Sequence, residues 1–151
     1  RAAIVICYEL EFPELIRELA LQEVVLIIAP TGQSSHWPAA ARFNCRTRAF
    51  ENGIFVAYAN SNGKLNGIEF MGESKIIGPD GLDIVNAEQG EKLITAEIDS
   101  STIKVVREKL PYLKDSISLH WKEPMAIHKI PLKNYILEWN GSIKESFFKL
   151  I

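Results

Sequence analysis

The sequence lacks the features of membrane-spanning and nucleic-acid-binding proteins. Its longest apolar runs, residues 2–7 and 24–30, are far shorter than the roughly 20 residues that a helix needs to cross a bilayer. Lys and Arg are dispersed among acids and the net charge is only -2, so there is no basic stripe to bind a phosphate backbone. We therefore expect no membrane and no nucleic acid among the partners of this protein.

The sequence is also poor in residues that bind metals or form disulfides. Its two cysteines, Cys7 and Cys45, have a separation that fits no zinc motif. Its three histidines, His36, His120 and His128, form no i, i+4 pair and have no nearby pair of acids. We expect no metal site. Two free thiols in a reducing cytoplasm fit the sequence better than the alternative, a disulfide between them.

The sequence has neither an initial Met nor a signal-peptide pattern. It opens on Arg1 and passes directly into an apolar run, so we expect that this is not a natural start. What is present is 47% hydrophobic and 24% charged residues, the balance of one ordinary globular domain with a sizeable core.

The first 30 residues have the pattern of a strand–helix–strand unit. Residues 2–7 and 24–29 are short, β-branched and continuously apolar, which is typical of strands buried on both faces, and Pro30 should end the second. Between them, Pro13 suits a first helical turn and leucines recur at helical spacing, which predicts a helix over residues 13–22. Such a unit places two parallel strands side by side.

Turn-forming residues divide the rest of the chain into short elements. A loop at 31–36 leads to a predicted helix from Trp37-Pro38 to near Asn52-Gly53, and a strand at 54–59 and a loop at 60–67 follow. Further strands are predicted at 73–77, 83–86 and 92–98, with a turn at Pro79-Asp80-Gly81 between the first two. The last predicted element is a helix capped by Ser100 or Ser101 that ends before Pro111. Alternation of strands and helices favours the α/β class. The tail has no such pattern and leaves Trp121, Trp139, Phe147 and Phe148 unexplained.

Cys7 stands where the first strand gives way to a turn and then to a helix. This geometry lifts a nucleophile clear of a sheet and directs backbone N–H groups at a substrate, which suits acyl transfer. On position alone, the alternative is a cysteine that packs as a small hydrophobe. The residues around Cys7 favour the catalytic hypothesis.

Five blocks of sequence occur in the order and spacing of one known family. They are residues 6–14 (ICYELEFPE), 26–30 (LIIAP), 48–52 (RAFEN), 56–63 (VAYANSNG) and 70–81 (FMGESKIIGPDG). Over about residues 2–113 the chain thus resembles the C-terminal half of the nitrilase superfamily of carbon-nitrogen hydrolases, and it leans toward the amidase-like branch. The resemblance implies an α-β-β-α sandwich, of which this chain would form half or more.

The resemblance also implies a Glu–Lys–Cys catalytic set in which Cys7 is the nucleophile, without a metal or organic cofactor. The Glu would act as general base and acid, and the Lys would stabilise the tetrahedral intermediate. In the family both residues precede the Cys, and residues 1–6 contain neither. Glu9, Glu11 and Lys75 do not match these positions, so the roles are not transferred to them. We therefore expect this chain alone to be inactive.

Other candidate site residues lie beside Cys7 or after neighbouring strands. Tyr8 would offer its backbone N–H to the oxyanion, with a packed aromatic ring as the alternative. Trp37 and Asn60 are candidates for substrate contacts, because loops after parallel strands border the pocket of an α/β fold. For Trp37 the alternative is packing at the start of its own helix, and for Asn60 it is turn formation.

Glu9, Glu14 and Arg48 are candidates for supporting the site. Either acid could orient the turn after Cys7 or pair with an arginine such as Arg48. For Glu14 the competing interpretation is an acid that complements the dipole at the start of a helix.

The resemblance implies a hydrolase that releases ammonia from small amides, or from nitriles, incomplete as this chain. Its C-terminal hydrolase part would cover residues 1–113, and residues 114–151 would be an extension suited to oligomerisation. Half of a sandwich would leave an apolar sheet face in water, so we expect a homo-oligomer. The alternative is a catalytically inactive fragment that serves as an interaction or structural module.

Overall fold

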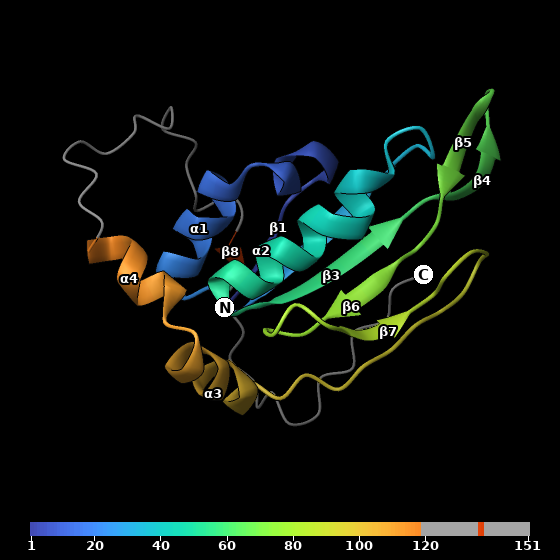
Figure 1. The fold of residues 1–151 in the computed structure, drawn as a ribbon. Coiled ribbons are helices and arrows are strands. Elements are labelled where there is room, and N and C mark those ends of the chain that lie inside the picture. Colours follow the sequence, from blue (N-terminus) through green and yellow to red (C-terminus); the bar gives the residue numbers. More distant parts are fainter. Residues whose placement is uncertain (119–135, 138–151) are drawn as a thin grey trace.

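The protein is built around one mixed sheet, seen in a computed structural model that describes residues 1–118 and 136–137 (Figure 1). The sheet's strands are β1 (Ala2–Ile4), β2 (Leu26–Thr31), β3 (Phe55–Asn60), β6 (Lys75–Ile77), β7 (Asp83–Asn86) and β8 (Ile136–Leu137). They lie in the order β7-β6-β3-β2-β1-β8. The central strands β1, β2 and β3 are parallel, and the others join them antiparallel. The architecture confirms the predicted α/β class.

The strand–helix–strand unit predicted for the first 30 residues is confirmed. α1 (Pro13–Leu21) connects β1 to β2, and Ala3 pairs with Ile27. The second strand differs from the prediction, because β2 continues through Pro30 to Thr31. The fixed φ of proline is compatible with an extended strand, and near the strand end it removes only one donor from the ladder.

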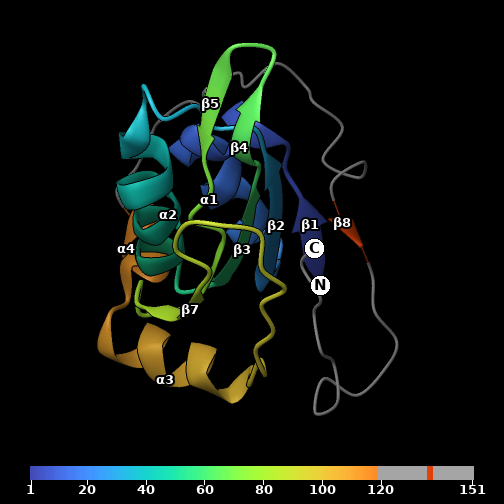
Figure 2. The same cartoon turned by 90° about the vertical axis from the view of Figure 1, so that its right-hand side faces the viewer.

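Two helices cover one face of the sheet. α1 and α2 (Cys45–Asn52) lie side by side across it, and α4 (Tyr112–Ser118) contacts both (Figures 1 and 2). The predicted second helix begins at Pro38 and ends at Gly53, whose φ of 55° gives the left-handed stop expected of glycine. Within this helix lies a π-helical turn, η2 (Ala40–Asn44), which the sequence pattern did not predict.

Apolar side chains pack on both faces of the sheet. Val5, Ile16 and Leu19 belong to the core between the sheet and its covering helices. On the other face, Phe55 and Ile76 are buried with residues of the segment 87–103, which runs into α3 (Ser101–Lys109). The prediction of a bare apolar sheet face is therefore wrong for β2, β3 and β6, because the chain itself covers them.

A two-stranded hairpin stands where a loop was predicted at residues 60–67. β4 (Asn62–Leu65) and β5 (Ile68–Met71) pair antiparallel and project beyond the end of the main sheet (Figures 1 and 2). Asn66 and Gly67 form the connecting turn, with φ values of 50° and 81°. Asn-Gly is the dipeptide that best suits such a turn, so the sequence carried the signal for this hairpin.

Two further predictions met different outcomes at the sheet edge. The strand at 83–86 is β7, and the turn before it is confirmed by a hydrogen bond of 2.9 Å from the Gly81 N–H to the Gly78 carbonyl. The strand predicted at 92–98 is wrong, because this segment makes only isolated bridges. Its apolar side chains, such as Ile94 and Ile98, pack on the sheet face instead of joining its edge.

The cap of α3 also differs from the prediction. Ser100 makes no capping hydrogen bond through its side chain, and the Asp99 carboxylate instead accepts the Ser101 N–H at 2.8 Å. Within the described part of the chain, no helix is long and apolar enough to cross a membrane, and no group of three His, Cys, Asp or Glu could hold a metal ion. Several residues discussed above lie outside the described part of the chain: Trp121, Trp139, Phe147, Phe148, His120 and His128.

Candidate active site

Cys7 begins a tight turn at the end of β1. The turn is a 3-10 helix, η1 (Cys7–Glu11), which leads through Phe12 into α1. The φ of Cys7 is 50°, an uncommon value for a residue that carries a side chain. Its thiol is free and half-buried. The structure thus has Cys7 at the strand–turn–helix junction predicted from sequence, in a strained conformation of the kind that accompanies functional residues.

Glu9 orients this turn from within. Its Oε2 atom accepts a hydrogen bond of 2.6 Å from the Ile6 N–H, one residue before Cys7. A carboxylate engaged in this way stabilises the turn, which agrees with the supporting role predicted for Glu9. Glu14 is exposed at the start of α1, where an acid complements the helix dipole.

Arg48 fixes the turn from outside. Its side chain is 8% exposed and donates to the carbonyl oxygens of Leu10 at 3.2 Å and Glu11 at 2.7 Å. Its ion-pair partner is Glu51 at 3.0 Å, so the predicted pairing of Arg48 with Glu9 or Glu14 is wrong. The pairing follows from helical spacing, because Glu51 is three residues further along the same helix. Arg48 therefore ties α2 to the end of η1.

A pocket of about 560 Å³ opens beside the turn. Tyr8 and Glu11 of η1 line it on one side, and Trp37, Ala40 and Phe43 line it on the other. Tyr8 and Trp37 are 64% and 74% exposed, so neither residue is packed in the core. The structure thus brings together two residues that the sequence predicted for the site, and their roles toward a substrate stay predictions.

Asn60 crosslinks two loops. Its Oδ1 accepts the Gln33 N–H at 2.6 Å, and its Nδ2 donates to the Gly72 carbonyl at 2.8 Å. The Ser74 hydroxyl accepts the Asn60 N–H at 2.9 Å. These bonds give Asn60 a structural duty, as in the alternative interpretation. Substrate contact by Asn60 stays a prediction.

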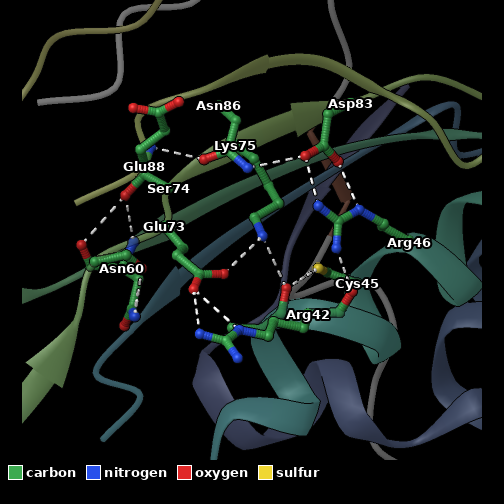
Figure 3. Close-up of polar contacts among 12 residues, drawn as sticks. Arg42, Cys45, Arg46, Asn60, Glu73, Ser74, Lys75, Asp83, Asn86 and Glu88 are labelled. Atoms are coloured by element: carbon green, nitrogen blue, oxygen red, sulfur yellow. Dashed lines mark hydrogen bonds and ion pairs between the residues drawn. The ribbon is translucent and has the colours of Figure 1, made fainter. Parts of the chain in front are cut away.

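Lys75 and Glu73 form a buried ion pair beside η2 that sequence reasoning did not assign to the site (Figure 3). Lys75 is fully buried on β6, and its Nζ lies 3.4 Å from Glu73 and 3.1 Å from the Ala41 carbonyl. Glu73 also accepts hydrogen bonds of 3.0 and 2.9 Å from Arg42. A charged lysine within an apolar strand sequence is the signal that could have found this cluster.

A second ion pair joins the same helix to the sheet edge. Arg46 donates to both carboxylate oxygens of Asp83, at 2.8 and 2.6 Å, and also to the Arg42 carbonyl. Two parallel bonds of this kind fix both the distance and the orientation of the partners. The start of α2 is therefore held against β7 as well as β6.

These contacts, together with burial, shift the pKa values of several groups. Burial alone would raise the pKa of Glu73, but the hydrogen bonds and charges of Arg42 and Lys75 lower it overall. Burial alone would also raise the pKa of Asp83, but the hydrogen bonds of Arg46 and Asn86 and the charges of Arg46 and Lys75 together lower it. Burial raises the pKa of the Cys45 thiol, and the charge of Lys75 only partly opposes this. Both acids are therefore ionised, and Cys45 is a protonated thiol, near neutral pH.

The chain matches the profile of the Carbon-nitrogen hydrolase family over residues 1–108, which include the Cys7 turn and most of the sheet. It belongs to the carbon-nitrogen hydrolase family. A hydrolase encoded in the pqqF 5' region of Pseudomonas protegens is 41% identical over 110 residues, which are 73% of this chain and 39% of the relative. A 2-oxoglutaramate amidase of Bacillus subtilis is 36% identical over 114 residues, which are 73% of this chain and 42% of that enzyme.

Solved structures of this carbon-nitrogen hydrolase family share the fold. Nit3 of Saccharomyces cerevisiae, a member of branch 10 of the nitrilase superfamily, superposes with a TM-score of 0.69 at 28% identity, covering 73% of this chain and 41% of Nit3. A mutant amidase from Nesterenkonia sp. AN1, with the acetamide moiety of fluoroacetamide added covalently at its active site cysteine, gives 0.63 at 27% identity, covering 77% and 44%. This carbon-nitrogen hydrolase chain thus spans less than half the length of these relatives.

Proposed function

We propose that the protein to which this chain belongs hydrolyses small carboxamides to a carboxylic acid and ammonia, with Cys7 as the nucleophile. The observation that supports this most directly is the position of Cys7, half-buried at a strained turn between a parallel strand and a helix. The next residue, Tyr8, lines an open pocket. Relatives that are amidases, one of them modified at its active site cysteine by an acetamide group, support the same class of substrate.

In the proposed reaction the Cys7 thiolate attacks the amide carbon, forming a C–S bond and a tetrahedral oxyanion. The oxyanion collapses, the C–N bond breaks, and the nitrogen takes up a proton and leaves as ammonia. Water then adds to the thioester, the C–S bond breaks, and the acid leaves while the thiolate is regenerated. Tyr8 follows Cys7 in the first turn of η1, where N–H groups have no acceptor within the helix, so its N–H suits the oxyanion.

The acid–base chemistry needs groups that residues 1–6 do not supply. Lys75 is committed to the Ala41 carbonyl and Glu73, and Glu9 to the turn backbone, so neither is free for a proton transfer at Cys7. We propose that the general base and the lysine come from sequence that the longer relatives have in addition to the part matched here. On this proposal, catalysis requires both parts of the hydrolase.

The test is ammonia release from a panel of small amides and nitriles. Three proteins are compared: the 151-residue chain, a version extended N-terminally with its genomic upstream sequence, and the extended version carrying Cys7→Ser. We expect amide turnover only in the extended protein, lost on Cys7→Ser with no change in melting temperature. Mass spectrometry of a quenched reaction should find the acyl group on the Cys7 peptide of the extended protein.

Other outcomes would decide against parts of this proposal. No turnover in any version would favour the inactive interaction or structural module. Turnover in the 151-residue chain would show that the base and lysine are already present. Faster release from nitriles than from amides would move the substrate class to nitriles.

We also propose that the protein self-associates and works in a reducing compartment such as the cytoplasm. Large apolar side chains, including Tyr8, Phe12, Trp37 and Phe43, are exposed on the described part of the chain. Sedimentation of the chain as a single monomeric species would contradict self-association.

A further inference from the structure

The π-helical turn η2 forms one wall of the pocket that Tyr8 and Glu11 of η1 also line. Such turns are rare and occur mostly as single insertions within α-helices, often at functional sites. Here the N–H of Cys45 donates to the Ala40 carbonyl. In an α-helix it would donate to Ala41, the residue four positions earlier. The Ala41 carbonyl therefore loses its usual backbone donor.

Two side chains bind the Ala41 carbonyl in place of that donor. Lys75 Nζ lies 3.1 Å from the oxygen, and Cys45 Sγ lies 2.8 Å from it. Lys75 comes from β6, across the interface between helix and sheet. Burying an ammonium group is costly unless it is paired, so this contact needs a reason beyond packing. The reason that the geometry offers is to satisfy the carbonyl that the π turn exposes.

Glu73 extends this contact to the pocket wall. It balances the charge of Lys75 at 3.4 Å and binds Arg42 of η2 with two hydrogen bonds (Figure 3). Arg42 lines the pocket together with Ala40 and Phe43. The π turn is thus held at two adjacent residues, Ala41 by Lys75 and Arg42 by Glu73.

We infer that Lys75 and Glu73 are positioning residues that hold η2 in its π conformation and thereby set the acyl-group specificity of the pocket. Loss of the π turn would change the rotation of the helix by about one residue, or about 100°. Phe43 and Ala40 would then present different surfaces to the acyl group of an amide. This inference rests on the proposed function, because it concerns the same pocket.

The experiment compares Lys75→Met with Lys104→Met in the extended protein. Methionine keeps the length of the lysine side chain but donates no hydrogen bond, and Lys104 is an exposed residue of α3 far from the pocket. The readout is the ratio of kcat/KM for hexanamide to that for acetamide. We expect Lys75→Met to lower this ratio by about tenfold, since differences of a few methylenes in a pocket have effects of that order. Lys104→Met should leave it unchanged.

The ratio separates positioning from stability, because a smaller fraction of folded enzyme lowers both kcat/KM values equally. A second variant, Glu73→Gln, keeps the inference testable if the Lys75→Met protein does not fold. It keeps the size of the side chain and weakens the contacts to Arg42 and Lys75. We expect the same direction of change in the ratio, with a smaller effect.

Backbone hydrogen exchange gives an independent readout of η2. In both variants, exchange should accelerate at residues 40–45 and not at residues 13–21 of α1. An unchanged substrate ratio in both variants would overturn the inference, whatever the exchange rates. If the extended protein hydrolyses no amide, the proposed function is wrong, and hydrogen exchange alone then tests the inference. Unchanged exchange at residues 40–45 in both variants would overturn the inference. Faster exchange confined to that segment would support it.

Discussion

At the residue scale, the two cysteines differ in exposure, backbone conformation and contacts. Cys7 is half-buried at a strained turn beside a pocket. Cys45 is fully buried, donates its S–H to the Ala41 carbonyl, and has its pKa raised by burial. The sequence pattern already placed Cys7 at the end of a strand. The burial of Cys45 and its contact with the Ala41 carbonyl follow only from the tertiary structure.

We expect iodoacetamide to label Cys7 of the folded chain at least about ten times faster than Cys45, because Cys45 can react only after local opening. Peptide mass spectrometry over a time course measures the two rates. In the matched Cys7→Ser variant, the remaining thiol should stay unlabelled until denaturant is added. Equal rates in the folded chain would contradict this expectation.

Arg48 should contribute more to stability than any exposed cation. Arg48→Met removes the donors to the Leu10 and Glu11 carbonyls and should lower the free energy of unfolding by about 2–4 kcal/mol. Urea denaturation followed by circular dichroism measures this change. The exposed control Lys104→Met should change it by less than about 0.5 kcal/mol. A similar small effect for Arg48→Met would show that the turn does not depend on this anchor.

At the element scale, apolar periodicity predicted the elements that pack on the core. The strands β1, β2 and β3, the helix α1, and the helix that ends at Gly53 all lie where the pattern placed them, within a few residues. Elements were predicted wrongly where one local sequence pattern is compatible with two different structures. The segment 92–98 is apolar because it covers the sheet, and a covering segment and an edge strand have similar sequences.

The turn before β7 requires glycine at position 81, and this requirement can be tested by substitution. Gly81 has a φ of 78°, and a Cβ atom there would lie 2.9 Å from Phe50 Cβ and 3.3 Å from the Arg46 carbonyl oxygen. Gly81→Ala should therefore destabilise the chain by more than the roughly 1–2 kcal/mol of left-handed strain alone. The control Gly67→Ala has a similar φ of 81° but no atom within 4 Å, so it isolates the strain. Equal melting temperatures would contradict the expected clash.

At the scale of the whole molecule, ion pairs join the covering helices to the sheet. Arg42–Glu73 and Arg46–Asp83 connect the helical segment 40–46 to the antiparallel strands or to the segment before them. Lys75 of β6 pairs with the same Glu73. Both acids have lowered pKa values in the folded state. They bind fewer protons than in the unfolded chain, so they stabilise the fold at neutral pH.

This stabilisation should be present above about pH 4, the usual range of free carboxyl groups, and should be lost as the pH falls below it. Melting temperatures from pH 7 to pH 2 measure the loss. Asp83→Asn should reduce the fall of the melting temperature between pH 7 and pH 2, because it removes an acid whose pKa is lowered in the folded state. The exposed control Glu91→Gln should leave this fall unchanged. An equal fall of the melting temperature in Asp83→Asn and in the unchanged chain would contradict the stabilising role of the Asp83 carboxylate.

The sequence by itself determined the family, the strand–helix–strand unit and the position of Cys7 at its turn, because these depend on neighbouring residues and their periodicity. Only the tertiary structure decided the partners of Arg48, the buried Lys75–Glu73 pair and the π turn that they hold. The contacts of Arg42 with Glu73, of Lys75 with the Ala41 carbonyl and of Arg48 with the Leu10 carbonyl join residues that are 31 to 38 positions apart. Their formation depends on how the helices lie on the sheet, which no local pattern specifies.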